Sequence, residues 1–238
     1  MRYSGSKNRL SKYILPYIEE RLKNNPNMYY VEPFMGGCNI LDKVNHPYKI
    51  GSDSNPYIVA LWRFLQSGGQ LPTNVDKTLY TAIKTNPEKY PDWLIGYVGS
   101  ACSYGGAWFA GYANFNEKRK ENHIKEAYNG IQKQLSKFRF LEETSFQCTS
   151  YDELQIPEKS LIYCDPPYNG TRGYKDSFDS IRFWDWVRKM RNDGHILIIS
   201  EYNAPDDFQC IWQMEKKDGM KTTIQGGKQP TRIEKLFL

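Results

Sequence analysis

The chain has few of the residues from which metal sites and disulfide frameworks are built. It contains three histidines and five cysteines in 238 residues, and no two cysteines form a C-x-x-C pair. An odd number of scattered cysteines argues against a disulfide framework and against a zinc site, and it favours free thiols in a reducing cytoplasm. We therefore expect no metal and a cytoplasmic location.

Long apolar runs are also lacking. No segment approaches the roughly 20 apolar residues that a membrane-spanning helix needs. The opening residues MRYSGSKNRL lack the apolar core of a secretory signal. The chain is 39% hydrophobic and 25% charged, which is typical of soluble globular domains. We expect no membrane partner, while the net charge of +5 permits a polyanionic one without requiring it.

The predicted elements follow the order of a doubly wound α/β sheet. Apolar spacing predicts a helix within 6–25, and short strands follow at 28–34 and 48–53. Residues 35–44, MGGCNILDKV, start with two glycines and are predicted to turn helical. A further helix begins at Pro56 after the N-cap Asn55 and stops at Gly68.

The same rhythm resumes after residue 141. An amphipathic pattern with Gly194 as its stop predicts a helix over 178–194. The predicted strands of this part lie at 146–150, 160–165, 195–202, 208–215 and 231–238. No helix separates the last two, so we expect an antiparallel hairpin at the sheet edge.

Residues 71–141 interrupt the α/β pattern, and we predict that they form an inserted region between 1–70 and 142–238. They hold ten Lys and Arg against six Asp and Glu, which is most of the excess positive charge. A loop rich in glycine and aromatic residues, 104–116, precedes a charged helix predicted over 117–140. Aromatic faces can stack bases, but they serve equally well as a small core for the region.

Three features are predicted to meet at one edge of the sheet. Ligands of open α/β sheets bind outside the carboxyl ends of the strands. The glycine turn at 36–37, Asp53 and Asp165 each follow a predicted strand. A carboxylate at the end of the second strand can bind ribose hydroxyls. Because the G-x-G-x-x-G spacing is absent, we favour a nucleoside-type ligand over a dinucleotide.

The segment SLIYCDPPYNG at 160–170 ends an apolar strand with an acid and two prolines. The prolines fix the backbone, so Asp165 and the Pro166 carbonyl make two acceptors held close together. They suit a flat group with two N–H bonds, and Tyr168 can stack on the ring that carries it. A purely structural turn would explain the same residues.

Five segments together resemble the Dam-type adenine DNA methyltransferases of the alpha arrangement, especially their phage members. The segments are DPPY at 165–168, VEPFMGGCNI at 31–40, YSGSKNRL at 3–10, GHILIISEY at 194–202 and RIEKLF at 232–237. The resemblance implies a Rossmann-like class I S-adenosylmethionine-dependent methyltransferase fold. This fold has a mostly parallel seven-stranded sheet and here would carry an inserted target-recognition subdomain.

The resemblance also implies roles for individual residues. The S-adenosylmethionine site, which releases S-adenosylhomocysteine, would comprise Tyr3, Lys7, Glu32, Phe34, Gly36, Gly37, Asp53, Tyr151 and Asp165. The target adenine would be held by Asp165, Pro166, Pro167 and Tyr168. The family motif usually reads Phe-x-Gly-x-Gly, and Cys38 stands here in place of the last glycine.

The implied reaction methylates the exocyclic amino group of a flipped-out adenine in a specific sequence of double-stranded DNA. The predicted DNA contacts are Tyr104, Trp108, Arg172, Tyr174 and Lys175. Methylation of cytosine in DNA or of adenine in RNA is an alternative, as is a DNA-binding homologue with impaired catalysis. A restriction endonuclease partner and an oligomeric state are not indicated by the sequence, and the expected setting is a bacterium or a phage-infected host.

Overall fold

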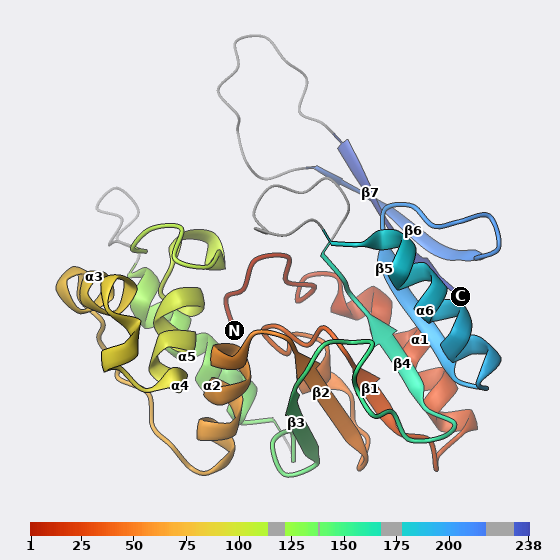
Figure 1. Cartoon of the computed structure of the whole chain (residues 1–238), viewed down its shortest axis with the longest axis horizontal. Coiled ribbons are helices and arrows are strands. Elements are labelled where there is room, and N and C mark those ends of the chain that lie inside the picture. The colour runs from red at the N-terminus through yellow and green to blue at the C-terminus, as the bar shows by residue number, and fades with distance from the viewer. Residues whose placement is uncertain (114–121, 138, 168–177, 218–230) are drawn as a thin grey trace, which may run out of the picture.

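The centre of the molecule is one seven-stranded sheet (Figure 1). A computed structural model describes residues 1–113, 122–137, 139–167, 178–217 and 231–238. The strands are β1 Tyr30–Glu32, β2 Lys49–Asp53, β3 Thr144–Cys148, β4 Leu161–Cys164, β5 Ile196–Glu201, β6 Cys210–Lys217 and β7 Thr231–Phe237. Their order is β3-β2-β1-β4-β5-β7-β6. β1 to β5 pair in parallel, whereas β7 runs antiparallel to β5 and β6. The predicted sheet and its C-terminal hairpin are confirmed.

The two faces of the sheet pack against different helices. Tyr30 and Tyr163 point to the face covered by α1 (Ser11–Asn24), where Ile14 and Ile18 are fully buried. The intervening strand residues, such as Ile162, face α6 (Ser180–Asn192), whose core residues are Phe183, Trp186, Val187 and Met190. Burial on both faces is typical of a parallel sheet and fixes the register of each strand.

Local sequence signals set the bounds of α2 (Pro56–Gln66). The Asn55 side chain accepts a hydrogen bond from the Tyr57 N–H, and Pro56 occupies the first helical position. Gly68 follows the helix with a φ of +87°, a conformation that glycine adopts without strain. Both predicted ends of this helix are therefore confirmed.

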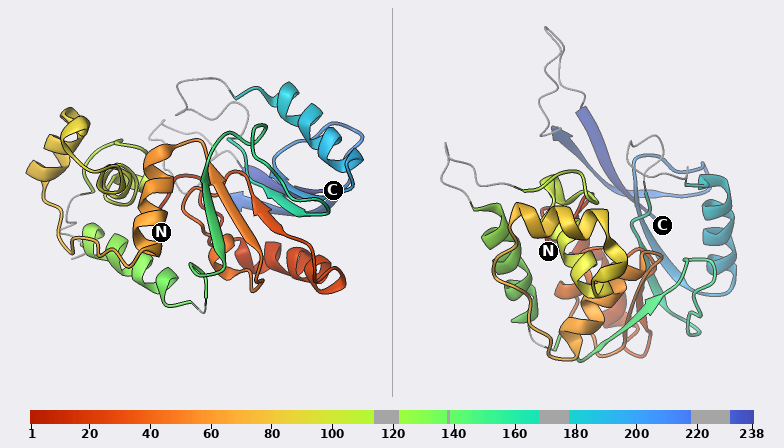
Figure 2. Two further views of the ribbon diagram at one scale, coloured as in Figure 1. Left: turned by 60° about the horizontal axis from the view of Figure 1, so that its bottom comes forward. Right: turned by 60° about the vertical axis from the view of Figure 1, so that its left-hand side comes forward.

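The described part of 71–141 consists of helices and turns joined by irregular segments, and its strand-like pairing is limited to an isolated bridge between Ser103 and Tyr112. Its elements are α3 Lys77–Thr85, α4 Asp92–Gly96, a π-helical turn at Tyr97–Ala101, short 3-10 turns at Pro87–Lys89 and Tyr104–Gly106, and α5 His123–Leu135. Figures 1 and 2 show α3, α4 and α5 gathered with α2 beyond the β3 edge of the sheet. The helix predicted over 117–140 is too long at its C-terminal end, because α5 stops at Leu135 and turns follow.

The helix predicted over 35–44 is wrong. Only a 3-10 turn at Leu41–Lys43 forms there. Cys38 adopts a left-handed backbone with a φ of +52°, which a right-handed helix cannot contain. A 3-10 turn of three residues takes the place of the predicted helix, so no α-helix N-terminus follows the glycine turn.

Two kinds of feature are missing from the described ranges. No helix there is both long and apolar enough to cross a bilayer. Nor do three or more His, Cys, Asp or Glu side chains gather there in a group that could hold a metal ion.

Candidate active site

The candidate site lies where the order of the strands reverses. β1 pairs with β2 on one side and with β4 on the other, so the chain leaves β1 between two parallel neighbours. Phe34 follows β1, Asp53 ends β2 and Asp165 follows β4, all at the carboxyl edge of the sheet. Open α/β sheets bind their ligands at such a point.

The glycine turn is shaped by the ring of Tyr3. Gly36 has a φ of +42°, and a Cβ added there would lie 2.5 Å from Tyr3 Cε1. A Cβ on Gly37 would lie 2.8 Å from the Cβ of Tyr3. The Gly36 carbonyl also accepts a hydrogen bond of 3.1 Å from Trp62 Nε1. Both glycines are therefore needed so that Tyr3 can pack directly on the turn.

Asp53 holds this turn against the end of β2. Its Oδ2 accepts a hydrogen bond from the Gly36 N–H at 3.0 Å, and its Oδ1 accepts one from the Asn55 N–H at 2.9 Å. Burial raises the pKa of the Asp53 carboxyl. Each carboxylate oxygen can accept more than one hydrogen bond, so both retain acceptor capacity.

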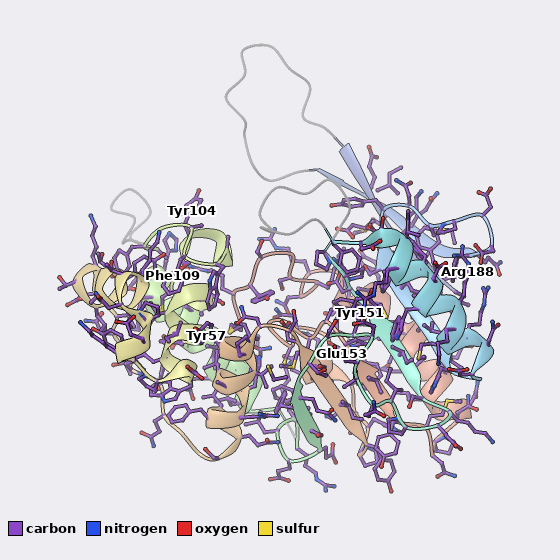
Figure 3. All side chains as sticks on the ribbon, viewed as in Figure 1. Tyr57, Tyr104, Phe109, Tyr151, Glu153 and Arg188 are labelled. Atoms are coloured by element: carbon purple, nitrogen blue, oxygen red, sulfur yellow. The ribbon has the colours of Figure 1, made fainter. Side chains whose placement is uncertain are left out.

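An aromatic group lines the same edge. The rings of Phe34 and Tyr151 lie 5.3 Å apart between centroids, and Phe178 and Phe183 meet Phe34 edge-on. Tyr151 is buried against Trp186, with 5.1 Å between ring centroids. Figure 3 shows Tyr151 beside the sheet and α6. This cluster offers apolar surface at the edge of the sheet where Asp53 ends β2.

Lys7 and Asp165 form a partly enclosed ion pair. Lys7 Nζ lies 2.7 Å from Asp165 Oδ1, and the Lys7 side chain is only 5% exposed. Burial alone would lower the pKa of the Lys7 ammonium, but the charges of Asp165 and then of Glu234 outweigh it and raise that pKa. The raised pKa keeps the Lys7 ammonium protonated beside the Asp165 side chain at the end of β4.

A comparison with protein families identifies the family of the chain. The model of the D12 class N6 adenine-specific DNA methyltransferases matches residues 3–92 and 106–191, about three quarters of the chain. The chain belongs to this family. The match includes the glycine turn, Asp53 and the DPPY segment, and the sheet described above agrees with the class I methyltransferase fold.

Curated relatives of this methyltransferase are methylases or methyltransferases by name. The chain is 24% identical over 210 residues to the retron Ec67 DNA adenine methylase of Escherichia coli, covering 79% of this chain and 72% of that protein. It is 24% identical over 231 residues to the type II methyltransferase M.FokI of Planomicrobium okeanokoites and 26% identical over 214 residues to the modification methylase StsI of Streptococcus sanguinis. These matches cover 84% and 80% of this chain but only 35% and 32% of the relatives.

The remaining predicted cofactor residue, Glu32, lies inside the methyltransferase core. Its side chain is buried and accepts a hydrogen bond of 2.6 Å from the Tyr30 hydroxyl. Burial raises the pKa of Glu32 to about 8, so its carboxyl is largely neutral at pH 7. Its burial and its hydrogen bond from Tyr30 thus place the Glu32 side chain in the core of the protein.

The predicted target-binding and DNA-binding residues are only partly described. Pro166 is buried and Pro167 is half-buried, whereas Tyr168, Arg172, Tyr174 and Lys175 lie outside the described residues. Tyr104, within residues 71–141, is 69% exposed (Figure 3). Trp108 is 42% exposed and stacks on Tyr57, with 5.7 Å between ring centroids, so its ring serves partly as packing.

Sequence reasoning missed two buried polar residues of the site. Gln134 on α5 donates hydrogen bonds from Nε2 to the carbonyl oxygens of Gly37 at 3.0 Å and Cys38 at 3.3 Å. Glu234 on β7 lies 4.0 Å from Lys7 Nζ. Glu234 had a visible signal, because it shares a strand face with the fully buried Leu236.

Proposed function

We propose that this methyltransferase transfers the methyl group of S-adenosylmethionine to the exocyclic amino group of a flipped-out adenine at a specific sequence in double-stranded DNA. The supporting observation is the Asp165 carboxylate, held by Lys7 at the strand reversal, on the same edge of the sheet as Phe34 and Asp53. The family match supports adenine as the base.

The residues at the sheet edge suit S-adenosylmethionine. The Asp53 oxygens each accept a backbone N–H and retain lone pairs for ribose hydroxyls. Phe34 and Tyr151, which pack on each other at the same sheet edge, offer apolar surface for the adenine ring. When bound, S-adenosylmethionine supplies a methyl group that its sulfonium sulfur has already activated.

The role of the protein is then to orient and stabilise the amine. An aromatic amine is a poor nucleophile, because its lone pair is delocalised into the ring. The Asp165 carboxylate and the Pro166 carbonyl would accept hydrogen bonds from its two N–H groups and direct the lone pair towards the methyl group. The negative charge of Asp165 would also stabilise the positive charge that develops on nitrogen as the C–N bond forms and the C–S bond breaks. S-adenosylhomocysteine would then leave, and the nitrogen would give up one proton to water. Alignment of the two reactants supplies much of the remaining rate.

We propose that residues 71–141, the predicted inserted region, recognise the DNA sequence. Its excess of Lys and Arg suits phosphate contacts. Tyr104 projects from it and is the most exposed large aromatic residue in the described part of the chain. We propose that Tyr104 contacts DNA, while Trp108 supports the loop through its stacking on Tyr57.

Mass spectrometry of nucleosides tests the proposed activity. The purified chain is incubated with S-adenosylmethionine and DNA of varied sequence, which is then digested. N6-methyladenine is the expected product. The proposal is wrong if the modified base is methylcytosine, or if RNA incubated in parallel is methylated while the DNA is not.

A further inference from the structure

Glu234 is a carboxylate where an apolar residue is expected. It lies in β7 opposite Met214 of β6, on the same face as Leu236, and is 2% exposed. Burial of an ionisable side chain is expensive unless a partner of opposite charge accompanies it. The position therefore calls for an explanation beyond packing.

The explanation lies in the side chains that face it. Lys7 Nζ lies 4.0 Å from Glu234 Oε2 and 2.7 Å from Asp165 Oδ1. The side chains of Lys7 and Glu234 are 5% and 3% exposed, whereas that of Asp165 is 21% exposed. Three segments far apart in the chain thus form a row that runs from the core to the candidate site.

We propose that Glu234 is a positioning residue for methyl transfer, which it supports by sharing the Lys7 ammonium with Asp165. This inference rests on the proposed function. The Glu234 carboxylate and Asp165 both attract the Lys7 ammonium. Because the ammonium is shared, it compensates less of the negative charge of Asp165, which stays a stronger acceptor for the amine and a better stabiliser of the positive charge that forms there.

The electrostatics of Lys7 agree with this role. Burial opposes its charge, while Asp165, Glu234 and Tyr202 favour it and raise the pKa of the ammonium. Tyr163, on β4 beside the row, interacts with the charges of Asp165, Glu32 and Glu234. Because Glu234 is one of the charges that hold the proton on Lys7, its removal must lower the pKa of Lys7.

The test compares Glu234→Gln with Glu215→Gln, which changes an exposed glutamate on the adjacent strand β6. We expect Glu234→Gln to lower kcat about tenfold. A loss of this size needs only a small decrease in the electrostatic stabilisation of the transition state. The KM for S-adenosylmethionine should change less than about threefold, since Asp53 and Phe34 are untouched. Glu215→Gln should leave both constants unchanged. Equal kcat values for Glu234→Gln and the parent would overturn the inference.

An NMR titration of 13C-labelled lysine in the protein without cofactor gives a readout independent of activity. The Lys7 ammonium should titrate at lower pH in Glu234→Gln than in the parent, and the alkaline limb of the kcat profile should move in the same direction. An unchanged Lys7 titration would overturn the inference. If Glu234→Gln does not fold, Glu234→Asp replaces it, because the shorter side chain also lowers the pKa of Lys7 by moving the charge away. If the parent protein shows no methyl transfer, the proposed function is refuted. The titration of Lys7 still tests whether Glu234 acts on Lys7.

Discussion

Replacement of Gly36 by alanine tests the link between the glycine turn and Tyr3. The new Cβ would lie 2.5 Å from Tyr3 Cε1 and 3.0 Å from Tyr3 Cδ1, distances that require the ring to move. The backbone at Gly36 has a φ of +42°, which disfavours any side chain. Two separate penalties therefore act at one position.

A matched control separates the backbone penalty at Gly36 from the steric penalty of displacing the Tyr3 ring. Gly68 has a φ of +87° and no atom within 4 Å of an added Cβ, so Gly68→Ala measures the backbone penalty alone, about 1 kcal/mol. Displacement of the Tyr3 ring adds about 1–3 kcal/mol of overpacking strain. We expect Gly36→Ala to lower the free energy of unfolding of the parent by about 2–4 kcal/mol. In a protein that already carries Tyr3→Ala, the same change should lower it by about 1 kcal/mol, because the ring is absent and only the backbone penalty remains.

Urea denaturation of the four variants and the parent measures these values. Gly36→Ala should also weaken S-adenosylmethionine binding in calorimetry, because the Gly36 N–H that holds Asp53 must shift. The reasoning fails if Gly36→Ala and Gly68→Ala agree within about 0.5 kcal/mol, or if Tyr3→Ala leaves the cost of Gly36→Ala unchanged.

Two further predictions concern buried polar groups. Gln134→Leu leaves the buried carbonyls of Gly37 and Cys38 without its hydrogen bonds, so urea denaturation should show a loss of about 1–3 kcal/mol; an unchanged midpoint would contradict this. Burial raises the pKa of Glu32 from 4.5 to about 8, so the stability due to its neutral form is complete below about pH 4.5 and is lost as the pH rises towards 8. Glu32→Gln should therefore gain stability relative to the parent between pH 5 and pH 8, and a constant difference would refute the assignment.

Elements with strong local signals were predictable from the sequence. The N-cap Asn55 with Pro56, the amphipathic pattern of α6 and the apolar run of β5 each identify their element without reference to the rest of the chain. The failure at 35–44 has a tertiary origin. The left-handed Cys38 sits in a turn held by Tyr3 and Gln134, and neither contact is visible in the local sequence.

The site was predictable to a similar extent. Asp53 and Asp165 could be placed because each ends a recognisable strand. The pairing of Lys7 with Asp165 was not predicted, since only a general cofactor role for Lys7 followed from the family resemblance. The burial of Glu234 had a signal in its strand face, but its contact with Lys7 did not, because that contact joins opposite ends of the chain and exists only in the folded sheet.

Methyl transfer by Asp165→Ala tests the central claim most directly. The variant and the parent are compared for N6-methyladenine formation in DNA, and S-adenosylmethionine binding is measured on both by calorimetry. We predict that the parent forms N6-methyladenine and that the variant loses at least about 99% of this activity, because removal of one charge-stabilising group typically costs 100-fold or more. Cofactor binding should remain detectable, since Asp53, Phe34 and the glycine turn are intact. Full methylation by Asp165→Ala would contradict the account.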